Sequence, residues 1–97
     1  MSTSRHIVVH GRVQGVGYRA FVEHQARRCG LTGWVRNRRD GTVEALFDGP
    51  PNAVAAMIEA CRQGPPGARV DGIDEREATP AERPHRNGDS FSVLPTL

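Results

Sequence analysis

Short apolar runs that suit β-strands recur along the chain. His6 to His10 holds three consecutive β-branched residues and ends at Gly11, which is typical of a buried strand. Thr32 to Arg38 and Thr42 to Asp48 are also strand-like. The Asp40-Gly41 pair between them is a strong signal for a tight hairpin turn, so we expect these two strands to be antiparallel neighbours.

Two other segments repeat their apolar residues at the spacing of a helix. The first runs from Arg19 to Cys29 and is stopped by Gly30 in the usual position after a helix. The second begins at Pro50 or Pro51, because proline suits the first helical position, and ends at Gly64-Pro65-Pro66. The apolar stripes consist of Phe21, Val22, Ala26 and Cys29 in the first helix and Val54, Met57, Ile58 and Cys61 in the second.

The remaining segments complete a recognisable order of elements. Val70 to Ala78 is predicted as a strand with a polar face, Thr79 to Asp89 as a polar loop, and Phe91 to Leu94 as a short terminal strand. The resulting order predicts an α+β fold, the ferredoxin-like split βαββαβ sandwich, with two helices on one face of an antiparallel sheet and a short extra C-terminal strand. We expect a single domain over residues 1–97, with its core between about residues 6 and 94.

Composition narrows the class of protein. The 97 residues include 13 basic ones, all arginine, against 11 acidic ones, and this balance, with a net charge of +2, is too even to indicate nucleic-acid binding.

Cys29 and Cys61 fall at opposite ends of antiparallel helices roughly 15 Å long. They are too far apart for a disulfide, so we expect free thiols. Met1 to Arg5 resembles no signal peptide, and no apolar run could span a membrane, which predicts a cytoplasmic protein.

The loop from Gly11 to Arg19 is the most informative stretch. It joins a buried strand to a helix start, where unpaired N–H groups and the helix dipole favour anions, and its glycines let the backbone fold inward. Arg19 adds a planar fork of donors that matches two phosphate oxygens. The loop is a candidate phosphate cradle, although it could equally serve only as a tight turn. Its chance match to the G-x-G-x-x-A dinucleotide fingerprint fails because the hairpin after the next strand excludes a parallel sheet.

Asn37 ends the second predicted strand and is the other candidate. In the split topology the first and second strands point the same way, so Asn37 and the glycine loop should share one edge, about 10 Å apart at the backbone. Alternation places Asn37 on the same face as Val35, the face covered by the helices. Taken alone, an asparagine at a hairpin entrance is as often a turn residue.

Together, Gly11 to Arg19 and Gly33-Trp34-Val35-Arg36-Asn37 resemble the acylphosphatase family, whose members carry G-x-V-Q-G-V-x-x-R and G-W-V-x-N in this order. The resemblance extends from about His6 to Leu94. It implies hydrolysis of acyl phosphates to a carboxylate and inorganic phosphate, with Arg19 binding the phosphate and Asn37 positioning water. It also implies that backbone N–H groups of the cradle come from Gln14, Gly15, Val16, Gly17 and Tyr18. A catalytically silent, regulatory or binding module of the same family is the alternative.

This chemistry needs few groups. An acyl phosphate expels a carboxylate whose conjugate acid has a pKa of about 4, so no general acid is required, and a guanidinium with aligned amides can stabilise the phosphoryl charge without a metal or cofactor. We expect a monomer that acts on a small acyl phosphate and binds neither nucleic acid nor membrane. An RNA-binding sheet would need paired aromatics on the third strand, which carries Glu44 instead.

The histidines are weaker candidates. His6 and His10 share a strand face and could bind a metal together. A metal site would need further ligands, and the sequence shows no cysteine or carboxylate pattern next to them. We therefore predict no metal site there, and solvated side chains at His24 and His85. Tyr18 is most simply a packing residue that can also border the acyl group.

Overall fold

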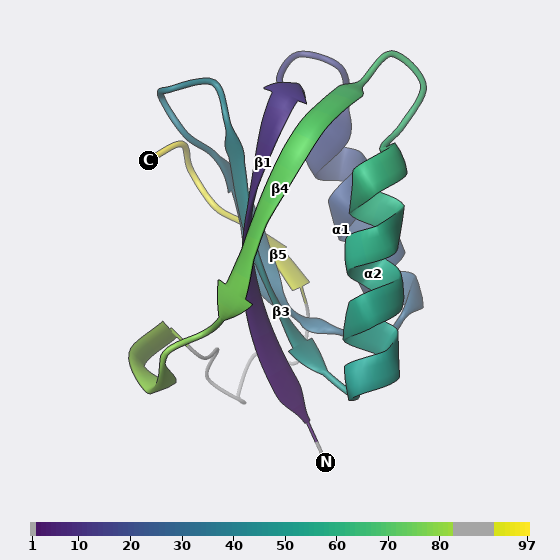
Figure 1. Cartoon of the computed structure of the whole chain (residues 1–97), viewed down its shortest axis with the longest axis vertical. Helices are drawn as coiled ribbons and strands as arrows, with labels where there is room; N and C mark the ends of the chain where they lie inside the picture. The colour runs from purple at the N-terminus through teal and green to yellow at the C-terminus, as the bar shows by residue number, and fades with distance from the viewer. Residues whose placement is uncertain (1, 83–90) are drawn as a thin grey trace.

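A computed structural model describes residues 2–82 and 91–97 of the chain. Both helices cover one face of a five-stranded sheet with the strand order β4-β1-β3-β2-β5 (Figure 1). The expected split βαββαβ order and the short last strand are confirmed. The elements are β1 (Thr3–Arg12), α1 (Tyr18–Arg28), β2 (Thr32–Asn37), β3 (Val43–Gly49), α2 (Pro51–Gln63), β4 (Arg69–Glu77), the 3₁₀ turn η1 (Pro80–Glu82) and β5 (Phe91–Val93).

Two features of the sheet differ from the sequence-based expectation. β1 is longer than the expected His6–His10, because it lies between β3 and β4 and pairs with them from Thr3 to Arg12. The sheet is mixed and not wholly antiparallel, because β5 pairs parallel to β2, with Gly33 opposite Phe91. β4 runs antiparallel to β1, whereas β5 runs in the same direction as β2 at the opposite edge of the sheet.

The core lies between the sheet and the two helices. The stripe of α1 buries Tyr18, Val22 and Ala26, and that of α2 buries Val54, Met57, Ile58 and Cys61. These side chains pack on Ile7 and Val9 of β1, Val35 of β2, Val43, Ala45 and Phe47 of β3, and Phe91 of β5. The Tyr18 hydroxyl donates a hydrogen bond of 2.7 Å to the Cys61 carbonyl and so joins the start of α1 to the end of α2. Both cysteines are free, as expected.

Gly33 is required by the close approach of two strands. Its φ of 130° is one that side chains rarely adopt, and a Cβ there would overlap the backbone carbonyl of Leu46 on β3. The glycine at the start of the Gly33–Asn37 motif therefore allows β2 to approach β3 closely near the start of β2.

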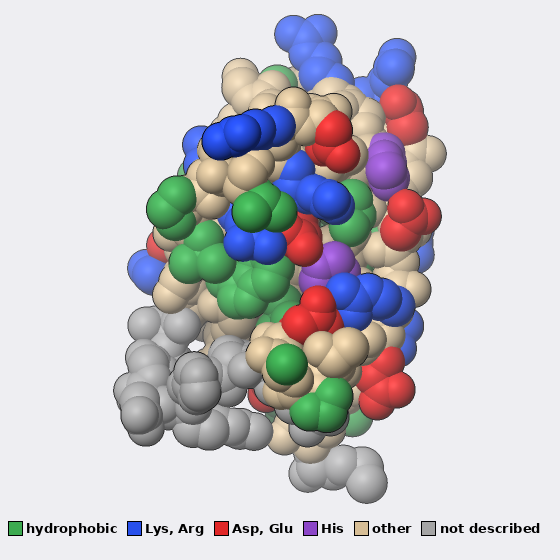
Figure 2. Space-filling model, turned by 90° about the vertical axis from the view of Figure 1, so that its left-hand side faces the viewer, with side chains coloured by type: hydrophobic (Ala, Val, Ile, Leu, Met, Phe, Trp, Pro, Cys, Tyr) green, Lys and Arg blue, Asp and Glu red, His purple; other side chains and the backbone are tan. Residues whose placement is uncertain are grey.

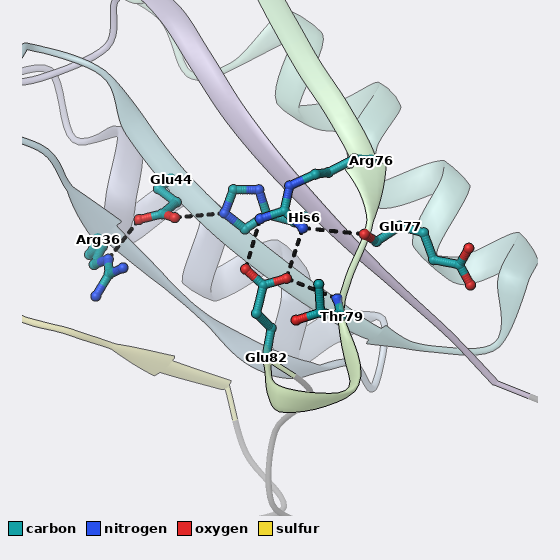
Figure 3. A network of polar contacts seen from close by, with 7 residues as sticks. All are labelled: His6, Arg36, Glu44, Arg76, Glu77, Thr79 and Glu82. Carbon is teal, nitrogen blue, oxygen red and sulfur yellow. Dashed lines mark hydrogen bonds and ion pairs between the residues drawn. The ribbon is translucent and has the colours of Figure 1, made fainter.

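The face of the sheet opposite the helices carries a polar network. Arginines, carboxylates and two histidines are interspersed with hydrophobic side chains across it (Figure 2). His6 Nε2 lies 2.6 Å from Glu44 Oε2, and Arg36 Nε donates to Glu44 Oε1 at 2.7 Å (Figure 3). The Arg36 guanidinium in turn lies over the Trp34 ring at 4.7 Å. The network buries His6 and Glu44 although no helix covers them.

Each of the two histidines has a carboxylate partner that no pattern next to it in the sequence had indicated. Glu44 lies beside His6, and Asp74 Oδ2 lies 2.8 Å from His10 Nε2. Both carboxylates come from neighbouring strands, so no pattern close to the histidines in sequence reveals them. His24 is exposed as expected, and His85 lies outside the described residues.

The expected Thr79–Asp89 loop is described only as far as Glu82, and residues 83–89 lie outside the described part. η1 folds its first residues back onto β4, where Arg76 forms an ion pair with Glu82 at 2.7 Å (Figure 3). Hydrogen bonds from Arg76 and from the Thr79 amide lower the pKa of the Glu82 carboxyl to about 2.

Candidate functional site

A pocket of about 360 Å³ opens at the end of the sheet where β1 and β2 finish and α1 begins. It brings together Arg19 and Asn37, which lie on different elements 18 positions apart in the sequence. The expectation that the glycine loop and the end of β2 meet at one edge is therefore confirmed. The pocket is lined by Val13, Gln14, Gly15, Gly17, Tyr18, Arg19, Ala20, Glu23, Asn37 and Val93.

The loop before α1 offers backbone N–H groups to the pocket. Gly15 and Gly17 have left-handed φ values of 74° and 79°, which only glycine adopts without strain. Gly17 caps α1 without a side-chain hydrogen bond, and the first amide to bond back to it is that of Phe21, at 3.0 Å. The amides of the first helical turn therefore have no acceptor within the helix, and together with the helix dipole they favour an anion.

Four of the five loop residues proposed to supply N–H groups line the pocket, namely Gln14, Gly15, Gly17 and Tyr18. Val16 does not line it, and its side chain packs against the core instead. Tyr18 is almost fully buried, and its hydroxyl is committed to the Cys61 carbonyl. Burial raises the pKa of that phenol above its ordinary value, so the hydroxyl stays protonated. The ring serves mainly as packing beneath the loop.

Arg19 lies in the first turn of α1 and is half-buried. Its guanidinium has no ion pair or side-chain hydrogen bond with any residue of the described ranges. Arg36 and Arg76 differ, since each binds a carboxylate on the opposite face of the sheet. An uncompensated guanidinium beside free backbone amides is suited to bind a doubly charged oxyanion.

Asn37 is fixed by its backbone but not by its side chain. Its carbonyl oxygen accepts a hydrogen bond of 3.1 Å from the Leu97 amide, beyond the end of β5. Its side-chain Oδ1 is buried and has no hydrogen-bond partner among the described residues. Leaving such a group unpaired costs about 1–3 kcal/mol, so the position favours a donor from outside the described residues, such as a water molecule.

Gln14 has a role that sequence reasoning missed. Its side-chain Nε2 donates to the carbonyl oxygens of Arg38 and Thr42, both at 2.8 Å. These carbonyls belong to the hairpin that follows Asn37, so the Gln14 amide ties the phosphate loop to the element carrying the other candidate residue. The sequence had suggested only the backbone N–H of Gln14, because a contact across 24 residues leaves no local signal.

The hairpin itself is held by its own side chains. Asp40 Oδ1 accepts hydrogen bonds from the backbone amide of Thr42 at 3.0 Å and from its hydroxyl at 2.6 Å. These two bonds hold the pKa of the Asp40 carboxyl below its usual value. Gly41 adopts a φ of 93° in the turn, which confirms the expected tight turn at Asp40-Gly41. The backbone immediately after Asn37 is thereby well defined.

Three lining residues, Ala20, Glu23 and Val93, were not anticipated. Ala20 follows Arg19 directly, Glu23 lies one helical turn after Arg19, and Val93 comes from β5, the edge strand beside β2. An alternation pattern cannot reveal that β5 reaches this pocket, because its position depends on parallel pairing with β2.

The lining residues define what the pocket can do. They include no serine, cysteine, lysine or histidine, and the single hydroxyl, that of Tyr18, is occupied. The Glu23 carboxylate also lines the pocket but is ion-paired with Arg27 at 2.9 Å, so the pocket suits direct attack by water on a bound anion. Within residues 2–82 and 91–97, no cluster of three or more His, Cys, Asp or Glu side chains could hold a metal ion. None of the described helices is long and apolar enough to span a membrane.

Comparisons with known proteins identify the family. Residues 5–93 match the family model for acylphosphatase. An acylphosphatase of Bradyrhizobium diazoefficiens is 59% identical over 92 residues, covering 94% of this chain and 93% of that protein. The crystal structure of acylphosphatase from Bacillus subtilis has a TM-score of 0.84 and 41% identity, covering 97% of this chain and 99% of that one. An acylphosphatase structure from Coxiella burnetii has a TM-score of 0.85 and 32% identity, covering 96% and 93%.

Proposed function

The chain belongs to the acylphosphatase family, which hydrolyses acyl phosphates, and from this premise we propose how its own residues carry out the reaction. Arg19 and the backbone amides of residues 14–18 bind the phosphoryl group. Asn37 holds the attacking water. The observation that carries the proposal is the meeting of an unpaired guanidinium and an unpaired buried amide oxygen in one pocket.

The reaction balances without further groups from the protein. The water oxygen forms a bond to phosphorus, while the bond from phosphorus to the acyl oxygen breaks and its electron pair leaves with the carboxylate. The proton of the water passes to an oxygen of the phosphoryl group, which departs as inorganic phosphate. The leaving carboxylate is stable at neutral pH because the pKa of its acid is about 4, so no donor is needed at that side.

The two side chains have separate tasks in this scheme. The guanidinium of Arg19 and the loop amides offset the charge on the phosphoryl oxygens, which is the larger part of catalysis in phosphoryl transfer. Asn37 Oδ1 accepts a hydrogen bond from the water and orients its lone pair toward phosphorus. Gln14 keeps these two parts in register through its bonds to the hairpin.

We propose that this hydrolysis needs no metal ion, since the positive charge that a metal would supply comes from Arg19 and the amides of the helix start. Turnover of benzoyl phosphate should then persist in excess EDTA. Loss of activity in EDTA, with recovery on adding Mg²⁺, would contradict the metal-free mechanism. The same assay tests the alternative of a catalytically silent module, which no observation favours and which predicts no turnover at all.

We further propose that the chain acts as a cytoplasmic monomer on a small-molecule substrate, with no nucleic-acid or membrane partner. The two free cysteines support a reducing compartment, and the ion-paired open face of the sheet supports a monomer. Sedimentation equilibrium of the purified protein tests the monomer, and titration with a fluorescent oligonucleotide tests for nucleic-acid binding.

A further inference from the structure

The pocket contains a carboxylate that the proposed reaction does not use. Glu23 is the one acidic residue that lines it, four positions after Arg19 on α1. Four residues of helix rise by about 6 Å, so the carboxylate follows Arg19 along the wall of the pocket at the length of a short acyl chain.

The position of Glu23 is held by Arg27, which makes two contacts. Arg27 Nη2 lies 2.9 Å from Glu23 Oε2, and the same nitrogen donates to the Phe91 carbonyl of β5 at 3.0 Å. The Glu23 side chain is 30% exposed and that of Arg27 is 55% exposed. Arg27 does not line the pocket, so a ligand inside meets the carboxylate and not its cation.

The pocket therefore has two chemically different ends. The phosphoryl end consists of the glycine loop and Arg19. The wall beyond it is formed by Ala20, Glu23 and Val93, and Val93 is 41% exposed although it is apolar. If the phosphoryl group is bound at the loop, this second wall is the lining that is left for the acyl group.

We propose that Glu23 is a specificity-determining residue that disfavours acyl phosphates whose acyl chain ends in a negative charge, relative to uncharged chains of the same length. This inference rests on the proposed function, because it assumes that the phosphoryl group binds at the loop and Arg19. A charge about 7 Å from the carboxylate, at an effective dielectric constant of about 40 to 80, is disfavoured by roughly three- to eight-fold. For comparison, a single methylene in a hydrophobic pocket changes selectivity by about ten-fold or more. The electrostatic effect is only slightly smaller, so a ratio of kcat/KM values can detect it.

The test uses a matched pair of substrates. Butyryl phosphate and succinyl phosphate have acyl chains of nearly the same length, and only the second ends in a carboxylate. The ratio of their kcat/KM values cancels any effect on the phosphoryl group that they share. In Glu23→Gln the ratio should shift toward succinyl phosphate by about three- to eight-fold, because the repulsion is lost.

Glu59→Gln is the matched control, since Glu59 is an exposed acid on α2 outside the pocket, and it should leave the ratio unchanged. Raising the salt concentration from 0.05 to 0.5 M should shift the ratio of the unaltered protein in the same direction as Glu23→Gln, because ions screen the repulsion. This measurement needs no variant and so serves even if Glu23→Gln folds poorly.

The outcomes separate the two proposals. Turnover of both substrates with a ratio that neither Glu23→Gln nor salt alters would overturn the role of Glu23 and leave the proposed function intact. Absence of turnover with either substrate would overturn the proposed function, and this inference with it. A shift of the ratio in Glu59→Gln as large as that in Glu23→Gln would also overturn the inference, since it would show an effect of overall charge.

Discussion

Replacing Asn37 with alanine should lower the turnover rate and at the same time raise the stability of the fold. The side-chain Oδ1 of Asn37 is buried with no partner among the described residues, and such a group costs about 1–3 kcal/mol of folding free energy. A water bound at Oδ1 offsets that cost only in part, because the water is itself immobilised. Removing the group therefore returns the remainder, while the alanine loses a little packing. We expect a net gain of about 1 kcal/mol, which corresponds to a rise in Tm of about 4–8 °C for a domain of this size.

Turnover should change in the opposite direction. Without Asn37 the water loses its orienting acceptor, and kcat for benzoyl phosphate should fall on the order of hundred-fold, or about 2.7 kcal/mol of transition-state stabilisation. The Ki for inorganic phosphate should hardly move, because the loop and Arg19 are untouched.

Thermal unfolding followed by circular dichroism and steady-state kinetics measure both effects on one preparation. Asn52→Ala is the control, since Asn52 is exposed in the first turn of α2 and should alter neither quantity much. A loss of stability above 1 kcal/mol with kcat preserved would refute the reasoning, because Asn37 would then be a structural hydrogen-bonding residue. Weakened phosphate binding with kcat preserved would instead make Asn37 a phosphate ligand.

Three further predictions address the neighbouring groups. Arg19→Lys keeps the charge but loses the planar fork, so competitive inhibition by inorganic phosphate should weaken at least ten-fold and kcat should fall, whereas Arg28→Lys at the far end of α1 should change neither. Gln14→Leu removes two hydrogen bonds to the hairpin, which should lower the unfolding free energy by about 2 kcal/mol in a urea titration and reduce kcat more than phosphate affinity. Burial raises the pKa of Glu44, but hydrogen bonds from its arginine and histidine partners outweigh burial and hold the pKa below its ordinary value. The ionised carboxylate therefore stabilises the fold at a pH above its unfolded pKa. That stabilisation is lost as the pH falls through the folded pKa. Glu44→Gln should therefore be less stable than the unaltered protein at pH 7, and the difference should shrink below about pH 4 in urea titrations at each pH; a constant difference would contradict the assignment.

The elements of the fold could be read from the chain because their signals are local. The stripe on α1, the proline at the start of α2 and the Asp40-Gly41 turn each depend on residues within a few positions of one another. The loop before α1 was visible for the same reason, since its glycines and Arg19 lie within one short segment. The ends of β1 were not visible, because pairing with two neighbouring strands extends it beyond its apolar run.

What only the tertiary structure decided are the contacts between distant segments. The sequence by itself identified Arg19 and Asn37 and the edge where they meet, but it could not show that Asn37 Oδ1 is buried without a partner or that the Gln14 side chain bridges to the hairpin. Val93 enters the pocket because β5 pairs parallel to β2, whereas Glu23 faces it from α1, where it is ion-paired with Arg27. Periodicity records which face of an element is buried, whereas the partner that a side chain meets depends on how whole elements pack, and that is set by the fold as a unit.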